Sequence, residues 1–301
     1  MHLIPAPGIT FPELIHPLRV IGGRAFDFTR EVAVMAVINR TPDSFYDRGA
    51  TFALDDAVAA SLAAIADGAD WVDIGGVKFA PGPVVPLAAE IDRIVPVVEA
   101  LRGTGVVISV DTFHPEVALA GIRAGAHVIN DTTGVSDPRI AEVVADSEAT
   151  LVITHSLAAP RTAYPAPQYV DVVAEVLDFL GERVALATGL GVPPERIIID
   201  PGHDLNKNTR HSLEITRRLG EITAFGLPTL VAVSNKDFVG ETIGRDRGER
   251  IEGSIAAAVA CILQGARIVR MHNVRAAVDA VRMTEGILGF REPAYLRHNI
   301  A

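Results

Sequence analysis

The stretch VVISVDTFHPEVALAGIRAGAHVINDT, residues 106–132, contains the unit from which the chain is built. Two short apolar runs, at 106–112 and 127–132, flank a segment rich in alanine and charged residues at 115–124. Each run is continuously apolar rather than alternating, as is typical of strands buried on both faces of a parallel sheet. The stretch therefore predicts a strand, a helix and a second strand parallel to the first.

The same alternation continues along the chain. Further strands are expected at 34–40, 71–76, 150–156, 197–202, 229–234 and 267–273, and further helices at 53–67, 86–102, 171–189 and 249–264. Eight such units in 301 residues predict an α/β protein with a (β/α)₈ TIM barrel. We expect an N-terminal extension at 1–31, the barrel at 32–290 and a C-terminal tail at 291–301.

A doubly wound sheet is the competing fold. Its most informative motif would be a Gly-x-Gly-x-x-Gly turn after the first strand. The first strand is followed instead by NRTPDSFYDRGA, residues 39–50, which lacks that turn. No Walker-type loop is present either, so the barrel is favoured.

Composition limits the partners of the protein. Lysine and arginine total 27 against 37 acidic residues, and the net charge of −10 argues against nucleic acid and anionic membranes as partners. No apolar run is long enough for a membrane span, and the N-terminus does not resemble a signal peptide. Cys261 lies in an apolar run and is interpreted as a core residue. We expect a cytoplasmic protein.

Polar residues stand at or near the ends of the predicted strands. A single Asp or Asn after a strand usually caps the next helix. In a barrel, however, the strand ends meet at one mouth, where chemistry takes place. The set therefore predicts a polar site, and its members are Asn39, Asp73, Asp111, Asn130, Asp131, His155, Asp200, Lys236, Arg270 and His272.

The residue types suggest what binds there. Asp111, Asn130, Asp200 and Lys236 offer acceptors, an amide and a cation, which suit a flat heterocycle with donor and acceptor edges. An arginine two residues before a histidine, at 270 and 272, is typical of an anion site. A metal hydrolase using His155, His203 and His272 is the rival, but it lacks a His-x-His pair at the first strand.

Several motifs together resemble the dihydropteroate synthase family. They are VINRTPDSF, DIGG followed by PG, ISVDT, VIND, IIIDPG, VSNKDFVG and RMHNV, in the order and spacing of that family over about residues 32–285. The resemblance implies a (β/α)₈ barrel, usually a homodimer. It also implies condensation of 6-hydroxymethyl-7,8-dihydropterin diphosphate with p-aminobenzoate, after diphosphate has left.

Matching positions carry the family's roles onto this chain. Asp111, Asn130, Asp200 and Lys236 resemble the pterin-pocket residues, and Asp111 would also stabilise the positive charge that develops. Arg270 and His272 resemble the diphosphate-binding pair. If the chain is active, the resemblance implies that the catalytic residues are Asp111, Lys236 and Arg270. Asn39 resembles an asparagine linked to Mg²⁺, the one cofactor implied.

The loop after the second strand departs from the family. There the family has Gly-Glu-Ser-Thr-Arg-Pro-Gly, a mobile loop whose threonine and arginine close over p-aminobenzoate and diphosphate. Phe79 and Ala80 replace these two residues. Lys78 keeps a positive charge in the loop, but a mobile point donor cannot copy a bidentate arginine.

The segment after the seventh strand also departs. The family's Ser-Arg-Lys-Ser is replaced here by Ser-Asn-Lys-Asp, with Asn235 and Asp237 at the changed positions. The final serine lies where the substrate carboxylate meets a helix start. Two like charges about 4 Å apart repel by about 1 kcal/mol in water and more when desolvated. We therefore expect the Asp237 carboxylate to occupy the anion-binding position at this helix start and to weaken the binding of p-aminobenzoate.

Two further loops differ. After DPG the family has Gly-Phe-Gly-Lys, whereas this chain has Asp204, Leu205 and Asn206 before its lysine. Without those glycines we expect a reshaped backbone. In the first loop Arg48 is interpreted as a solvated surface charge, with a replacement cation for catalysis as the alternative.

Three functions follow from this pattern. The first is an inactive or strongly impaired homologue that keeps a pocket for a pterin or a related heterocycle. The second is a working synthase with compensating residues. The third is a transferase that uses another acceptor, as in the related pterin-binding domains of corrinoid methyltransferases. The concentration of departures on the p-aminobenzoate side favours the first.

Overall fold

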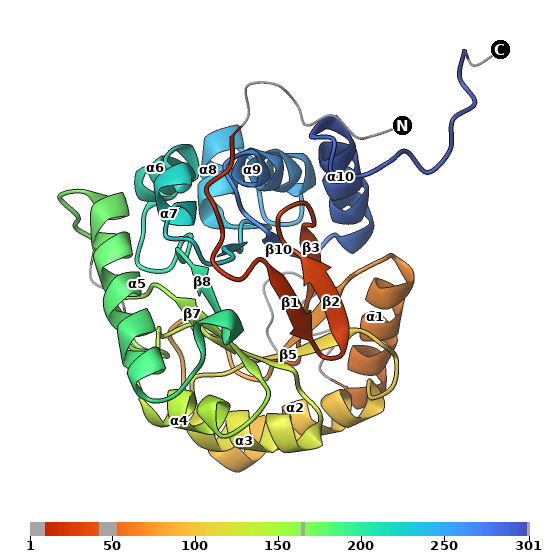
Figure 1. The fold of residues 1–301 in the computed structure, drawn as a ribbon. Coiled ribbons are helices and arrows are strands. Elements are labelled where there is room, and N and C mark those ends of the chain that lie inside the picture. The colour runs from red at the N-terminus through yellow and green to blue at the C-terminus, as the bar shows by residue number, and fades with distance from the viewer. Residues whose placement is uncertain (1–9, 42–52, 164–165, 300–301) are drawn as a thin grey trace.

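Eight parallel strands form a barrel in the computed structural model, which describes residues 10–41, 53–163 and 166–299 (Figure 1). Their order is β8-β7-β6-β5-β4-β3-β10-β9. The bounds are β3 Ala33–Asn39, β4 Trp71–Gly75, β5 Val107–Asp111, β6 Val128–Asp131, β7 Thr150–Thr154, β8 Ile197–Asp200, β9 Leu230–Val231 and β10 Ile268–Met271. A parallel bridge between Ile199 and Thr229 joins β8 to β9 and closes the ring. The predicted barrel and its strands are confirmed.

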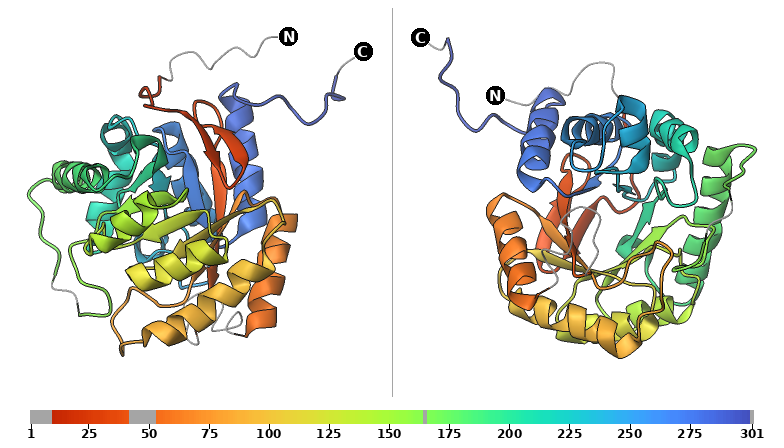
Figure 2. Two further views of the ribbon diagram at one scale, coloured as in Figure 1. Left: turned by 60° about the horizontal axis from the view of Figure 1, so that its bottom comes forward. Right: turned by 180° about the vertical axis from the view of Figure 1, so that it is seen from behind.

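Helices surround the strands on the outside of the barrel (Figures 1 and 2). They are α1 Leu54–Ala66, α2 Leu87–Ala100, α3 Pro115–Ala124, α4 Arg139–Ala145, α5 Val172–Gly189, α6 Thr209–Arg217, α7 Leu219–Thr223, α8 Asp237–Ile243, α9 Ile251–Leu263 and α10 Val274–Ile287, with a 3₁₀ turn at Pro194–Arg196. The main core lies between the helices and the outward strand residues. Cys261 on α9 is fully buried in it, as its apolar neighbours indicated.

The inside of the barrel changes from apolar to polar along its axis. Near their starts the strands contribute a buried apolar layer that comprises Met35, Trp71, Val107, Val128, Val152, Ile198, Leu230 and Ile268. Two residues further along, the same inward face becomes polar, with Asp73, Ser109, Asn130, Thr154, Asp200 and Arg270. The polar layer faces the carboxyl ends of the strands, the usual place of the site in this fold.

A β-hairpin closes the other end of the barrel. β1 (Leu18–Ile21) and β2 (Arg24–Asp27) pair antiparallel around Gly22 and Gly23, both with positive φ. Phe26 packs on Trp71 at a ring-centroid distance of 5.9 Å, so the hairpin joins the apolar layer inside the barrel. This hairpin was not predicted from the sequence, although a Gly-Gly pair between short strands is a hairpin signal.

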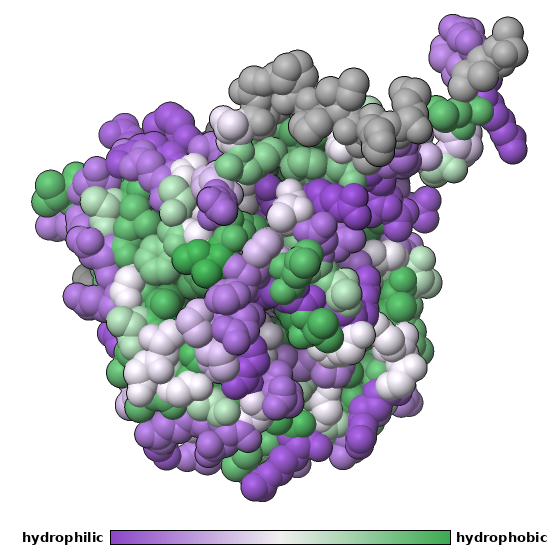
Figure 3. All heavy atoms as spheres, in the orientation of Figure 1, coloured by the Kyte–Doolittle hydropathy of each residue, from purple (hydrophilic) through white to green (hydrophobic). Residues whose placement is uncertain are grey.

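The outer face of the hairpin end is mixed in character. Apolar groups lie over the hairpin among charged and polar residues (Figure 3), and Leu18 and Val20 of β1 point outward and are exposed. Across the described ranges, no helix combines the length and apolarity that a membrane crossing requires. The C-terminal residues after α10 run away from the barrel (Figures 1 and 2).

Candidate functional site

A buried polar network lies directly below the mouth of the barrel. Asp73 on β4 is fully buried and accepts hydrogen bonds from Ser109 Oγ at 2.6 Å and from Asn130 Nδ2 at 3.1 Å. It also accepts one from Arg270 Nε at 2.6 Å. Buried charges need such partners, because desolvation of an unpaired carboxylate is very costly. Asp73 therefore holds the side chains of Asn130 and Arg270 in fixed orientations.

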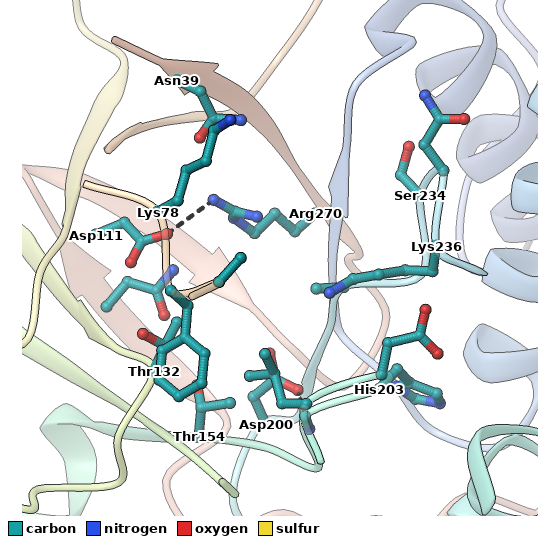
Figure 4. Close-up of a pocket in the computed structure, with 18 of the residues that line it drawn as sticks. Asn39, Lys78, Asp111, Thr132, Thr154, Asp200, His203, Ser234, Lys236 and Arg270 are labelled. Carbon is teal, nitrogen blue, oxygen red and sulfur yellow. Dashed lines mark hydrogen bonds and ion pairs between the residues drawn. The ribbon is translucent and has the colours of Figure 1, made fainter. Parts of the chain in front are cut away.

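Arg270 also reaches a second carboxylate. Its Nη2 lies 3.0 Å from Asp111 Oδ2 at the end of β5 (Figure 4). Burial, and next the charge of Asp73, raise the pKa of Asp111 to about 7, although Arg270 opposes the shift. Burial disfavours the charge on Arg270, but Asp73 and Asp111 outweigh it and raise the pKa of the guanidinium. The arginine is thus bridged to two carboxylates at the floor of the site.

Above this network a cavity of about 340 Å³ opens at the strand ends (Figure 4). Most of the singled-out positions line it, namely Asn39, Phe79, Ala80, Asp111, Asn130, Asp200, Leu205, Asn235, Lys236, Asp237, Arg270 and His272, whereas Asp73, Asp131 and His155 do not. The volume is in the range of small-molecule sites. The structure therefore brings the retained and the changed positions of the resemblance together around one space.

Three buried oxygen atoms of cavity-lining residues have no hydrogen-bond partner among the described residues. They are Asn130 Oδ1, Thr132 Oγ1 and Thr154 Oγ1. The amide nitrogen of Asn130 is held by Asp73, so its oxygen is available as an acceptor. Buried polar atoms in proteins almost always have partners, and a bound polar molecule or water would supply them here. The two threonines were missed from the sequence, although Thr154 has the inward period of β7.

Asp200 and Lys236 face the cavity from the next strands. Asp200 Oδ1 accepts a hydrogen bond from the Gly202 N–H at 2.7 Å, and burial raises its pKa to about 6. Lys236 immediately precedes α8 and extends into the cavity from the side opposite Asp111 (Figure 4). An acceptor and a cation therefore face the same space as the Asn130 and threonine oxygens.

The strand-end histidines do not form a metal site. His155 Nδ1 contacts Lys207 Nζ at 2.7 Å behind the cavity, and burial, with the lysine charge, lowers the pKa of His155 to about 2. His203 stacks on Phe238, while His272 bonds Ser234 Oγ at 3.0 Å. In the part of the chain that the structure describes, no three His, Cys, Asp or Glu side chains group as metal ligands. The metal-hydrolase alternative has no support here.

Asp131 binds nearby backbone N–H groups, as a single carboxylate at a strand end usually does. It does not line the cavity; its oxygens accept hydrogen bonds from the N–H groups of Thr133 and Val135, both at 2.8 Å. It therefore shapes the turn after β6.

Arg48 and the rest of the first-loop motif fall within positions 42–52, outside the described residues.

The start of α8 holds an internal anion, but that anion is Asp204. Asp204 Oδ2 accepts a hydrogen bond from the Asp237 N–H at 2.6 Å and a longer one from the Phe238 N–H at 3.3 Å. Its other oxygen lies 3.0 Å from Ser212 Oγ. The expectation that Asp237 itself fills this position is therefore corrected: the backbone of Asp237 donates, and the carboxylate comes from the loop after β8.

The Asp237 carboxylate turns toward two arginines. Its oxygens lie 2.9 Å from Arg247 Nη2 and 2.9 Å from Arg250 Nη1. Partial burial opposes ionisation, but the two arginines outweigh it and lower the pKa of Asp237. Asp237 thus lines the cavity as a paired charge, and its repulsion of another anion is weaker than the sequence alone implied.

The loop after β8 has two non-glycine residues in a backbone conformation that favours glycine. Asp204 and Asn206 have φ values of 64° and 52°, in the left-handed region that favours glycine. Asp and Asn are the residues that tolerate this region best after glycine. The Asn206 side-chain oxygen accepts hydrogen bonds from Leu157 and Ala158 N–H at 3.0 and 2.8 Å. Both positions therefore adopt a glycine-like conformation without glycine. The reshaping expected from the loss of the family's glycines stays a prediction.

Residues 35–272 match the protein family described as pterin binding enzyme. The chain is 45% identical over 267 residues to "Inactive dihydropteroate synthase 2" of Mycobacterium tuberculosis, covering 86% of this chain and 84% of the relative. It is 39% identical over 261 residues to dihydropteroate synthase of Escherichia coli K12, covering 86% and 93%. The structure of Xanthomonas albilineans dihydropteroate synthase with 4-aminobenzoic acid superposes with a TM-score of 0.83 at 37% identity, covering 91% and 98%.

Proposed function

This chain belongs to the pterin binding enzyme family, and we propose that it is a dihydropteroate synthase homologue that has lost the standard condensation. In this proposal the cavity retains a pterin-type heterocycle. It does not join 6-hydroxymethyl-7,8-dihydropterin diphosphate to p-aminobenzoate at a useful rate. The single observation that carries the proposal is the carboxylate of Asp204 on the first N–H groups of α8.

The retained half of the site supports a heterocyclic ligand. Asn130 Oδ1 and the two threonine oxygens offer acceptors to ring N–H or amino groups. Lys236 offers a cation to a ring carbonyl, and Asp200 adds a carboxylate at the same wall. The fixed network around Asp73 keeps Asn130 in place before any ligand arrives, which limits the ordering cost of binding.

The changed half of the site disfavours p-aminobenzoate. By the resemblance, the substrate carboxylate would meet the start of α8, where Asp204 now accepts both hydrogen bonds. A hydrogen bond to a charged group contributes about 1.5–3 kcal/mol, which corresponds to about 10- to 150-fold in affinity. The substrate would have to displace Asp204 and tolerate its charge, so binding is weakened on both counts.

Phe79 and Ala80 reinforce this loss. They line the cavity where the resemblance places a threonine and an arginine, so these two positions offer neither a hydroxyl nor a guanidinium to diphosphate or carboxylate. Lys78 supplies a positive charge nearby and points toward Asn39 (Figure 4). This lysine favours the second candidate, a working synthase with a compensating cation.

Mg²⁺ and a homodimeric, cytoplasmic state remain predictions from the resemblance. Asn39 lines the cavity and offers an amide oxygen, a ligand type that Mg²⁺ accepts together with phosphate oxygens and water. A bound Mg²⁺ would neutralise part of the charge of a diphosphate group.

Two titrations on the same protein preparation test the proposal. We expect calorimetry to show saturable binding of 6-hydroxymethylpterin diphosphate, and no heat from p-aminobenzoate when the pterin and inorganic diphosphate are both present. The E. coli synthase serves as the positive control for the second titration. Tight p-aminobenzoate binding would favour the working synthase instead.

A further inference from the structure

Arg161, in the loop after β7, makes several hydrogen bonds to the loop after β4. The Arg161 guanidinium donates hydrogen bonds to the carbonyl oxygens of Lys78 at 3.2 Å, Ala80 at 2.7 Å and Pro83 at 3.0 Å. The Arg161 N–H also donates to the Phe79 carbonyl at 3.0 Å. The 78–83 segment is thus bonded along its length to one residue that lies 78 positions or more further along the chain.

The backbone of Arg161 and the absence of a side chain at Gly82 both allow this contact. Arg161 adopts a φ of 63°, which is uncommon for a residue other than Gly, Asn or Asp. Gly82 lies so close that a Cβ atom added to it would overlap the Arg161 guanidinium. The Gly82 N–H also donates to the Arg161 carbonyl at 3.4 Å. The arginine and the glycine therefore form one contact, here called the Arg161 latch.

The latched segment forms part of the cavity wall. Lys78, Phe79 and Ala80 all line the cavity, and two of their carbonyls are held by the guanidinium. Hydrogen bonds to partly exposed carbonyls are individually modest, but several from one planar donor fix both position and orientation. The cavity wall after β4 is therefore already in place without a ligand.

We propose that Arg161 is a positioning residue that holds residues 78–83 as a preformed wall of the ligand site. Opening of this wall limits how fast a ligand enters and leaves the cavity. Arg161 lines neither the cavity nor the polar network below it, so it acts through Lys78, Phe79 and Ala80. The identity of the ligand rests on the proposed function; the latch itself does not.

Lysine-specific proteolysis tests the latch without any ligand. The chain has three lysines, Lys78, Lys207 and Lys236, and only the bond after Lys78 lies in the latched segment. Cleavage of a folded protein follows the population of the locally open state. We expect Arg161→Ala to speed endoproteinase Lys-C cleavage after Lys78 by about tenfold or more, with the other two sites unchanged.

Three further variants sharpen the test. Gly82→Ala breaks the latch from the other side and should reproduce the effect with Arg161 present. Arg161→Gln should restore part of the protection, because a single side-chain amide reaches fewer carbonyls, and it adds no cleavage site for the protease. Thr162→Ala removes a hydrogen bond to Ala159 in the same loop, outside the latch, and should behave as the wild type. Unchanged cleavage in Arg161→Ala, or equal acceleration at all three lysines, would overturn the proposal.

Stopped-flow fluorescence with 6-hydroxymethylpterin diphosphate then connects the latch to the site. Both the association and the dissociation rate should rise in Arg161→Ala and in Gly82→Ala, with a smaller change in affinity. Faster cleavage with unchanged binding rates would overturn the claim that the latch shapes ligand exchange. If the wild type binds no pterin, the proposed function fails, while the proteolysis still decides the latch.

Discussion

The Asp204 carboxylate lies 2.6 Å from the backbone nitrogen of Asp237, across a junction between the loop after β8 and the start of α8. Two residues that replace a glycine and a serine of the related family thus meet at one point. The loop residue supplies the anion and the helix residue supplies the N–H. This contact accounts for the proposed loss of p-aminobenzoate binding.

Replacing Asp204 by glycine should restore part of the anion site. The variant removes the internal acceptor, and glycine suits the φ of 64° at this position. We expect p-aminobenzoate affinity to rise by about tenfold or more, measured by calorimetry with pterin and diphosphate present. Asp204→Asn is the control, since it keeps an acceptor without the charge and should give a smaller gain. Equal, negligible heats in all three proteins would contradict the assignment.

Replacing Asp237 by serine should help less. The substitution removes a charge that is already paired with Arg247 and Arg250, and it leaves Asp204 on the helix start. Released from Asp237, the two arginines would attract the carboxylate of p-aminobenzoate or an ionised sulfonamide group, so either ligand should bind somewhat better than to the wild type. A gain larger than that of Asp204→Gly would identify Asp237 as the main obstacle.

Truncating Asp111 to alanine should weaken pterin binding. Asp111 lies at the cavity wall and its carboxylate holds one side of the Arg270 guanidinium. Loss of one hydrogen bond involving a charged group corresponds to about 1.5–3 kcal/mol. A fluorescence titration with 6-hydroxymethylpterin diphosphate measures the change, and an unaltered curve would remove Asp111 from the pocket.

The buried network should dominate stability at the barrel mouth. Asp73→Ala leaves Arg270 without its closer partner, and breaking a buried pair in this way costs about 3–5 kcal/mol of unfolding free energy. Ser109→Ala removes only one of the hydrogen bonds to Asp73 and should cost about 1–2 kcal/mol. Urea unfolding compares the two; equal losses would show that the ion pair is not the stabilising element.

The pH dependence of the free energy of unfolding should also reveal the raised pKa of the buried Asp200. Its pKa is raised to about 6 in the folded state, above the value of an unfolded aspartate, so the folded protein holds an extra proton between these values. The free energy of unfolding of the wild type should therefore fall relative to Asp200→Asn as the pH rises from about 4 to 6, by at most about 1.4 kcal/mol per unit. Urea curves whose separation is constant across this range would argue against the shift.

The barrel and most of its site were predictable from the sequence because both depend on local patterns. Continuous apolar runs mark the strands, and the fold places their carboxyl ends together, which is why Asp111, Asn130 and Lys236 share one cavity. The hairpin at Leu18–Asp27 was missed because the segment was interpreted only as an N-terminal extension and its Gly-Gly pair was not considered.

The finer contacts depend on where separate loops lie in space. Asp204 and the backbone of Asp237 are 33 positions apart, and nothing in the local sequence shows which carboxylate reaches the helix start. The Arg161 latch joins two loops that are further apart still. The left-handed backbone at Asp204 was equally hidden, because residues other than glycine adopt a positive φ only rarely.

The most direct test of the central claim is dihydropteroate production from 6-hydroxymethyl-7,8-dihydropterin diphosphate and p-aminobenzoate, assayed beside the E. coli synthase. An activation barrier raised by about 3 kcal/mol or more reduces turnover to about 1% or less. We predict product formation at or below that level for the wild type, with a measurable increase in Asp204→Gly. Turnover by the wild type at the rate of the E. coli enzyme would contradict the claim.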